Sequence, residues 1–295
     1  MEYQCPICDS TSREFNMYYR QCTECGLLFA PDGKNSPDLF TEAYNGHISG
    51  SNMAGFSDRM VRAKALHSLT IPQTALSTSA HQEALEFIKS RLAPGSYILD
   101  VGCSTGIFMI NLKNAGFNAL GCDIAKAPVD FLKTQGFSVY LGSIDEYPQE
   151  WPEPAVVTSF FVLHHIENPV EFLKQIHSKF PRSLIIISEY YDKGINFKLP
   201  QMKPPRTITL WTPESLQKLF AKAGYTNSMV KTTKSLASEV NMPLAGKTYA
   251  RWRRFIPTFI VSFYFVSRRV LFSPYALWLR LRTRSFSLLA IAEPK

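Results

Sequence analysis

A glycine-bearing turn after a buried strand constrains this chain more than any other feature. Residues 97–101 (Tyr-Ile-Leu-Asp-Val) form an apolar run of strand length, and Gly102 to Gly106 separate it from a helix predicted over 107–115. Glycine permits close backbone approach and left-handed dihedral angles. A helix that begins after such a turn presents unpaired N–H groups and the positive end of its dipole. The pattern therefore predicts a ligand at the end of this strand.

Helical and strand patterns alternate from residue 81 onward, which is typical of a parallel α/β sheet. Further strands are predicted at 117–122, 137–141, 155–160, 183–188, 226–232 and 285–292. Further helices are predicted at 82–92, 170–178 and from Pro213 to Ala223. Ligands of such sheets bind at the carboxyl ends of the strands, where the strand order reverses.

Residues suited to a nucleotide follow the next two strands. Asp123 closes the second strand, where its carboxylate can accept both ribose hydroxyls, and Ile124 can lie against a base. The loop 142–145 follows the third strand and is placed to meet the edge of an adenine.

The run from Asp100 to Gly106 (Asp-Val-Gly-Cys-Ser-Thr-Gly) resembles the first motif of class I S-adenosylmethionine-dependent methyltransferases. The acid after the second strand and the histidine after the fourth also follow the family order. The resemblance implies an α/β, Rossmann-like fold with a seven-stranded sheet whose last strand is antiparallel. It also implies that S-adenosyl-L-methionine is held by residues at the strand ends: Asp100, Gly102, Cys103 and Gly106 around its methionine part, Asp123 and Ile124 at the ribose and base, and Ser143 and Ile144 beside the adenine.

A nicotinamide-dependent dehydrogenase is the alternative for this half, since it also uses a glycine turn and a ribose-binding acid. The spacing fits the Gly-x-Gly-x-x-Gly pattern poorly, because Ser104 stands where the second glycine is required. Many of the methyltransferases also carry glycine where this chain has Ser104.

Two histidines follow the fourth strand and are the candidate catalytic residues. Methyl transfer is an in-line displacement that depends mainly on orientation, and an alcohol acceptor also benefits from a general base. His165 is the expected base and His164 the alternative, while a histidine that only shapes the pocket is equally open. Glu189 and Tyr190, at the end of the fifth strand, are expected to orient the acceptor.

Four cysteines near the N-terminus form two Cys-x-x-Cys pairs, Cys5 with Cys8 and Cys22 with Cys25. Each pair can present two thiolates from a tight turn, and four thiolates complete a closed tetrahedral zinc site. Because a closed site has no open coordination position, we expect structural Zn²⁺ in a small N-terminal zinc ribbon. Chance spacing and a redox pair are the alternatives.

The ribbon, Tyr44 and the stretch from Thr212 to Gly224 together resemble zinc-ribbon methyltransferases that modify sugars, lipids or natural products. The resemblance implies a small-molecule, glycan or lipid-linked acceptor and O- or C-methylation. Many of those proteins carry histidine where this chain has Arg206-Thr207, which leaves the acceptor chemistry open. An rRNA or tRNA methyltransferase is an alternative function, and a non-catalytic zinc-ribbon scaffold that binds the cofactor is another.

Positive charge gathers near the C-terminus. Residues 247–295 hold ten Lys and Arg and one acid, Glu293, so their net charge is +9. The whole chain carries +8, so the remaining residues sum to −1. Aromatic and apolar residues interleave with these cations. This pattern fits peripheral membrane contact through 247–284 and core-packed helices equally well, while nucleic-acid binding is less favoured. The longest apolar run, 255–266, is too short to span a bilayer.

The sequence therefore predicts a ribbon over 1–30, a linker and capping helix over 31–80, and a methyltransferase domain over 81–295 with a basic apolar insert at about 233–284. The N-terminus lacks a basic start followed by an apolar run, so we expect no signal peptide and a cytoplasmic protein, with contact at the inner membrane face left open.

Overall fold

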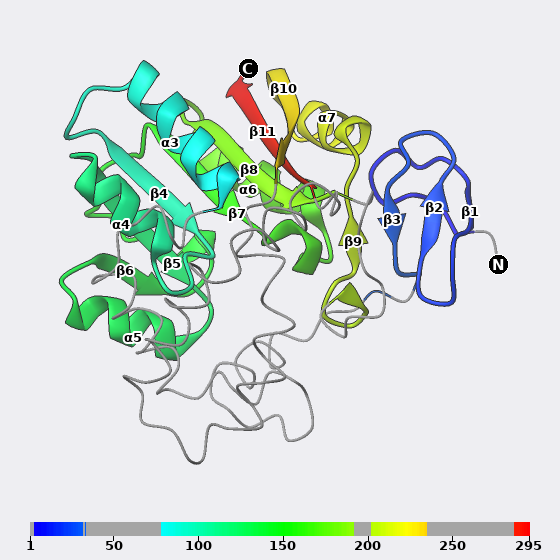
Figure 1. Ribbon diagram of the computed structural model, residues 1–295, viewed down its shortest axis with the longest axis horizontal. Coiled ribbons are helices and arrows are strands. Elements are labelled where there is room, and N and C mark those ends of the chain that lie inside the picture. The colour runs from blue at the N-terminus through cyan, green and yellow to red at the C-terminus, as the bar shows by residue number, and fades with distance from the viewer. Residues whose placement is uncertain (1–2, 32, 34–77, 192–201, 235–285) are drawn as a thin grey trace, which may run out of the picture.

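The computed structural model describes residues 3–31, 33, 78–191, 202–234 and 286–295, which form two sheets (Figure 1). The large sheet has the strand order β10-β11-β8-β7-β4-β5-β6. Its strands are β4 (Tyr97–Val101), β5 (Asn118–Asp123), β6 (Ser138–Leu141), β7 (Val156–Phe160), β8 (Leu184–Tyr190), β10 (Tyr225–Lys234) and β11 (Phe286–Pro294).

The strand directions confirm the predicted fold class. Neighbouring strands from β8 through β7, β4 and β5 to β6 are parallel. The last strand, β11, is antiparallel to both β8 and β10. The sheet is therefore a seven-stranded Rossmann-like sheet whose last strand is antiparallel.

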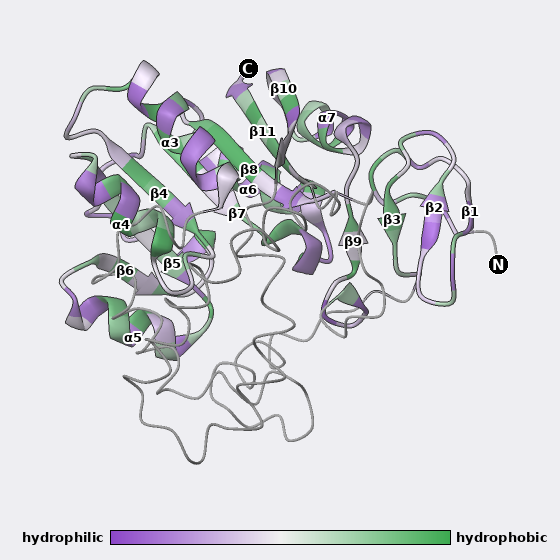
Figure 2. Cartoon of the chain, in the orientation of Figure 1, coloured by the Kyte–Doolittle hydropathy of each residue, from purple (hydrophilic) through white to green (hydrophobic). Residues whose placement is uncertain are grey.

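Helices cover both faces of this sheet. On β4, Ile98 packs in a cluster with α3 and α4, whereas its neighbour Leu99 packs in a cluster with α6 and α7. Figure 2 shows mostly apolar strands between helices that carry both apolar and polar residues, as expected for a sheet buried on two sides. The helices are α3 (Ser79–Arg91), α4 (Ile107–Asn114), α5 (Lys126–Thr134), α6 (Pro169–Lys179) and α7 (Pro213–Lys222).

Two elements differ from the sequence prediction for local reasons. Helix α3 begins at Ser79 rather than at residue 82, because Thr78 caps it and His81 bonds back to the Thr78 N–H at 3.2 Å. This is a capping box in which histidine replaces the usual Glu or Gln. Helix α5 was not predicted; its Pro128 lies in the first turn, where proline is tolerated.

The small sheet joins the N-terminal ribbon to a distant segment. Its order is β1-β2-β3-β9, and its strands are β1 (Ser12–Glu14), β2 (Arg20–Cys22), β3 (Leu28–Phe29) and β9 (Thr209–Leu210). Strand β2 begins at Arg20, because the Asn16 side chain accepts bonds from the N–H groups of Tyr18 and Tyr19 at 2.8 and 3.0 Å. These bonds hold the preceding residues in a turn.

The ribbon shares its core with the α/β domain. Apolar residues of the ribbon such as Ile7 and Leu27 belong to one buried cluster with Leu173 of α6 and Leu219 of α7. The ribbon therefore packs on the same side of the sheet as these two helices.

Most of the predicted linker and basic insert lies outside the described residues. This applies to the helix expected within 31–80, to Tyr44, and to the membrane-contact segment 247–284. Among the helices that the structure describes, none is long and apolar enough to cross a membrane.

Candidate functional site

The turn after β4 adopts the left-handed conformation at alternate residues. The φ angles are 74° at Gly102, 46° at Ser104 and 72° at Gly106. A Cβ atom on Gly102 would lie 2.4 Å from Val162 Cγ2, so the turn lies against the segment after β7. Glycine is required at 102 for both conformation and space, and the left-handed φ explains why glycine suits position 104.

Asp123 lies beside this turn at the end of β5. Its Oδ2 accepts the Ser104 N–H and its Oδ1 accepts the Ala125 N–H, both at 2.8 Å. Burial raises the pKa of this carboxyl, and the backbone N–H bonds oppose that shift. An ionised carboxylate offers about four acceptor positions, so each oxygen retains capacity for a ligand hydroxyl. The neighbouring Ile124 side chain is 48% exposed, which leaves an apolar surface next to the carboxylate.

The other predicted cofactor residues divide into accessible and buried groups. Ser143 is exposed, and its N–H bonds to Glu146 at 2.7 Å. The side chains of Cys103 and Ile144 are buried in the core, so only their backbone can reach a ligand at the surface of this site. Asp100 is also buried, accepts a 2.8 Å bond from Thr158 Oγ1, and has a pKa that burial raises to about 7.

His164 lies in a short 3₁₀ turn, η3 (Leu163–His165), that follows β7. Its Nδ1 lies 2.7 Å from Glu189 Oε2, while Glu189 Oε1 accepts the Leu163 N–H at 2.6 Å. Burial lowers the pKa of His164 to about 3 and raises that of Glu189 to about 8. Both shifts have the same physical cause, since a buried site disfavours either charged form.

His165 is held by a backbone carbonyl. Its Nδ1 lies 2.6 Å from the Arg206 carbonyl oxygen. Because a carbonyl only accepts hydrogen bonds, Nδ1 carries the proton and the neutral ring has its lone pair on Nε2. Burial lowers the pKa of His165 well below its usual value, so the ring stays neutral at physiological pH.

Glu189 lies in the buried interior and not at the surface where an acceptor could reach it. It was expected to orient the acceptor, but its side chain is 0% exposed and is bonded to His164 and Leu163. An acid at the end of the otherwise apolar β8 is the sequence feature that could have pointed to a buried partner. That partner is the histidine turn after β7, the neighbouring parallel strand.

The four predicted metal ligands converge in the ribbon, where their sulfur atoms all lie within 4.8 Å of one another. Sulfur–sulfur distances are 3.7 Å for Cys5–Cys25, 3.5 Å for Cys8–Cys22 and 3.7 Å for Cys8–Cys25. A tetrahedral ion with Zn–S bonds of about 2.3 Å separates its thiolates by about 3.8 Å. The observed spacing therefore fits one zinc ion.

In both cysteine turns a backbone N–H donates to the sulfur of the first cysteine of the pair. The Ile7 N–H donates to Cys5 Sγ and the Cys25 N–H donates to Cys22 Sγ, both at 3.4 Å. The residue after each pair, Asp9 or Gly26, is left-handed, with φ of 59° and 70°. Two equivalent turns facing each other are a donor set suited to a closed metal site.

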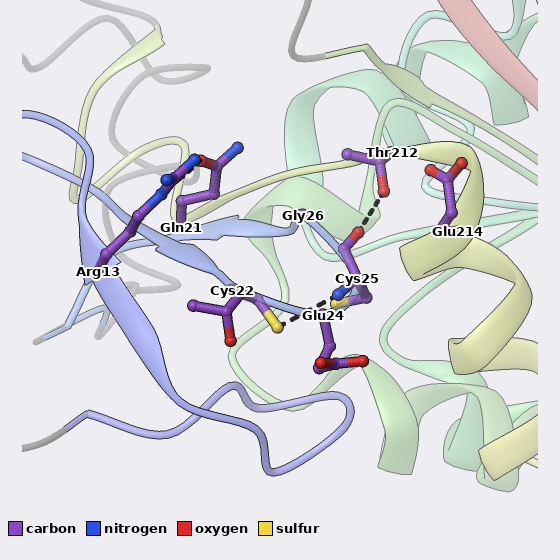
Figure 3. A pocket seen from close by; sticks show the side chains of 9 residues that line it. Arg13, Gln21, Cys22, Glu24, Cys25, Gly26, Thr212 and Glu214 are labelled. Atoms are coloured by element: carbon purple, nitrogen blue, oxygen red, sulfur yellow. Dashed lines mark hydrogen bonds between the residues drawn. The ribbon is translucent and has the colours of Figure 1, made fainter.

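A polar hollow of about 300 Å³ lies where the ribbon meets α7. Figure 3 shows Arg13, Gln21 and Glu24 on the ribbon side and Glu214 on the helix side, with Thr212 directed toward the Cys25 carbonyl. All of its lining residues come from the ribbon and the start of α7, so it is separate from the strand ends that carry the glycine turn and Asp123.

A mostly parallel sheet of this order, with a glycine turn and an acid at the ends of neighbouring strands, defines a Rossmann-like, nucleotide-cofactor class of α/β domain. The sequence matches the family described as "Methyltransferase domain" over residues 77–229, more than half of the 295 residues. The chain belongs to this methyltransferase family.

Curated relatives match a shorter stretch. Ubiquinone biosynthesis O-methyltransferase of Hahella chejuensis is 30% identical over 97 residues, which are 30% of this chain and 41% of the relative. The protein of the same name from Rickettsia bellii is 32% identical over 97 residues, 31% of this chain and 40% of its own. The chain thus spans about two fifths of the length of the curated relatives it matches.

Solved structures share the fold at low identity. Phosphoethanolamine N-methyltransferase 2 of Haemonchus contortus, in complex with S-adenosyl-L-methionine, has a TM-score of 0.57 at 16% identity, covering 91% of this chain and 62% of that one. Mycolic acid cyclopropane synthase CmaA1, complexed with SAH and CTAB, has a TM-score of 0.54 at 14% identity, covering 80% and 95%.

Proposed function

We propose that this chain is an S-adenosylmethionine-dependent methyltransferase that acts on a small-molecule, glycan or lipid-linked acceptor. The placement of Asp123 carries the proposal: its carboxylate lies within hydrogen-bond distance of the left-handed turn after β4, next to the exposed Ile124. A carboxylate, an apolar side chain and a close-approach turn are together what a ribosyl cofactor requires.

The residues at the strand ends then have distinct roles toward the cofactor. Asp123 accepts the ribose hydroxyls, and Ile124 packs on the adenine next to Ser143. Gly102 and Gly106 allow the backbone to approach the methionine part, and Asp100 lies in the strand beneath them. Bound S-adenosylmethionine supplies an electrophilic methyl group on a sulfonium sulfur.

His165 is the proposed general base for a hydroxyl acceptor. The Arg206 carbonyl keeps the proton on Nδ1, so Nε2 has the lone pair that an acceptor proton needs. The lowered pKa keeps the ring neutral, so Nε2 is unprotonated before the acceptor binds. His164 bonds through Nδ1 to the buried Glu189, so we assign it a supporting role in the turn.

The acceptor class rests on relatives rather than on geometry. The curated relatives are named O-methyltransferases of ubiquinone biosynthesis, which supports a hydroxyl on a small or lipid-linked molecule. The four-cysteine ribbon is proposed to hold one structural Zn²⁺, since its sulfur spacing fits that ion.

Methyl-labelled S-adenosylmethionine tests the function directly. The zinc-loaded protein is incubated with phenolic, sugar and polyprenyl-linked hydroxyl acceptors, and labelled product is measured. We expect methyl transfer to one of these acceptor classes. In His165→Ala, kcat should fall roughly 10²- to 10⁴-fold while cofactor affinity stays unchanged. In the control His177→Ala, kcat should change little. Binding of the cofactor without transfer to any acceptor would favour the non-catalytic alternative.

A further inference from the structure

We propose that the N-terminal ribbon positions the histidine turn: Tyr19 and β3, acting through residues 206–210, fix the tautomer of His165. The consequence for catalysis rests on the proposed function, whereas the positioning itself does not.

The ribbon first fixes β9. Leu28 and Phe29 of β3 pair antiparallel with Leu210 and Thr209 of β9. The Ala30 N–H extends this ladder by donating to the Ile208 carbonyl at 2.9 Å. Figure 1 shows β9 between the blue ribbon strands and the α/β domain.

The same short segment bonds to the histidine turn on its other side. The Ile208 N–H donates to the His164 carbonyl at 2.8 Å, and the Arg206 carbonyl accepts from His165 Nδ1 at 2.6 Å. Residues 206–210 are thus hydrogen-bonded to both the ribbon and η3. A shift of the ribbon strand would be transmitted to the atom that holds the His165 proton.

The Tyr19 side chain holds this segment in position through its hydroxyl group. It is 1% exposed, and its hydroxyl lies 2.6 Å from the Thr207 carbonyl oxygen and 3.0 Å from that of Met202. Thr207 directly follows Arg206, so this hydroxyl restrains the peptide next to the carbonyl that holds His165. A buried hydroxyl between two carbonyls is a costly arrangement to disturb.

Packing repeats the connection made by the hydrogen bonds. Tyr19, Leu28 and Leu210 form a small buried cluster against which Tyr190 packs. The Tyr190 ring contacts His164 edge-on, with ring centroids 4.9 Å apart. The ribbon therefore reaches the histidine pair by a second, apolar path.

The tautomer matters because the two imidazole nitrogens exchange roles. If the Arg206 carbonyl moves away, the proton is no longer held on Nδ1 and the ring can carry it on Nε2. A ring protonated on Nε2 cannot accept a proton there, so the ribbon would influence the fraction of His165 that is competent as a base.

Histidine ¹⁵N NMR of the zinc-loaded full chain tests the proposal without an activity assay. His165→Gln identifies the signal. Tyr19→Phe is compared with Tyr18→Phe, which keeps the packed ring and removes a hydroxyl that contacts the Lys203 side chain, at 3.3 Å, rather than the Thr207 carbonyl. We expect a protonated Nδ1 and unprotonated Nε2 in the unmodified protein and in Tyr18→Phe. In Tyr19→Phe the two signals should move toward a tautomer mixture, and kcat should fall roughly tenfold with little change in cofactor affinity.

An unchanged His165 tautomer in a folded Tyr19→Phe protein, even with a lower Tm, would overturn the proposal and leave the ribbon a stabilising element only. A shifted tautomer with unchanged kcat would support the positioning and contradict His165 as the base, so the two proposals fail separately.

Discussion

Asp123 and Gly102 contribute to the candidate site by opposite means at the residue scale. Asp123 supplies a side chain whose two oxygens are already aligned by backbone N–H groups. Gly102 contributes by having no side chain, because Val162 occupies the space that a Cβ atom would need. Both lie at the ends of the neighbouring strands β4 and β5, where we propose that the cofactor binds.

Gly102→Ala should lower stability and cofactor affinity more than Gly136→Ala. Both glycines are left-handed, with φ of 74° and 72°, but a Cβ on Gly136 meets nothing within 4 Å. Gly136→Ala should therefore show the backbone strain alone, about 1–2 kcal/mol, while Gly102→Ala adds about 1–3 kcal/mol of overpacking. Urea unfolding measures the difference; equal losses would contradict the close contact with Val162.

Glu189→Gln should flatten the dependence of stability on pH. Burial raises the pKa of Glu189 from 4.5 to about 8, so its contribution is present below pH 4.5 and is lost as the pH rises through 8. Burial lowers the pKa of His164 from 6.5 to about 3, which affects stability only below pH 6.5. Between pH 6.5 and 8.5 the unmodified protein should lose stability relative to Glu189→Gln in urea titrations.

Glu189→Ala is the matched disruptive variant. It leaves His164 Nδ1 and the Leu163 N–H without this partner in a buried place. The unfolding free energy should fall by about 1–3 kcal/mol for each of these unsatisfied neutral groups. A loss no larger than that of Glu189→Gln would show that the carboxyl does not organise the turn.

At the element scale, strands that depend on local sequence could be predicted, whereas pairing between distant segments could not. The strands of the large sheet were predicted to within a few residues, because apolar runs of strand length depend on local sequence. Strand β9 has two residues, and its pairing with β3 joins positions about 180 residues apart, so no local pattern could reveal it.

The candidate site shows the same division between local and distant interactions. Gly102, Asp123 and Ile124 could be proposed from the sequence because they follow predicted strands. The bond from His165 to the Arg206 carbonyl could not be predicted. Every residue has a backbone carbonyl, and the sequence does not show which one accepts a given bond.

Thr212→Ala should affect two elements together. Its hydroxyl caps α7 by accepting the Ser215 N–H at 3.1 Å, and it donates to the Cys25 carbonyl at 2.6 Å. We expect a loss of about 2–3 kcal/mol and faster zinc release to a chelator. Asn168→Ala, which removes only the cap of α6, should cost about 1 kcal/mol and leave zinc release unchanged. Similar zinc release in both variants would argue against the contact with the ribbon.

At the scale of the whole molecule, the ribbon and the α/β domain behave as one packed unit, because their apolar residues share a cluster with α6 and α7. Removing the proposed zinc ion should therefore loosen structure beyond the ribbon as well as within it. By hydrogen exchange, chelation should expose the Ile208 and His165 N–H groups while the β4–β5 ladder stays protected. Exchange changes confined to residues 3–31 would contradict this coupling.

Calorimetric titration of S-adenosylmethionine into the zinc-loaded protein tests the central claim most directly. We expect one cofactor per chain, at least tenfold weaker binding in Asp123→Ala, about 1.4 kcal/mol, and unchanged binding in Asp130→Ala, an exposed acid on α5 paired with Lys126. A titration of the unmodified protein with neither heat nor a rise in Tm would contradict the account.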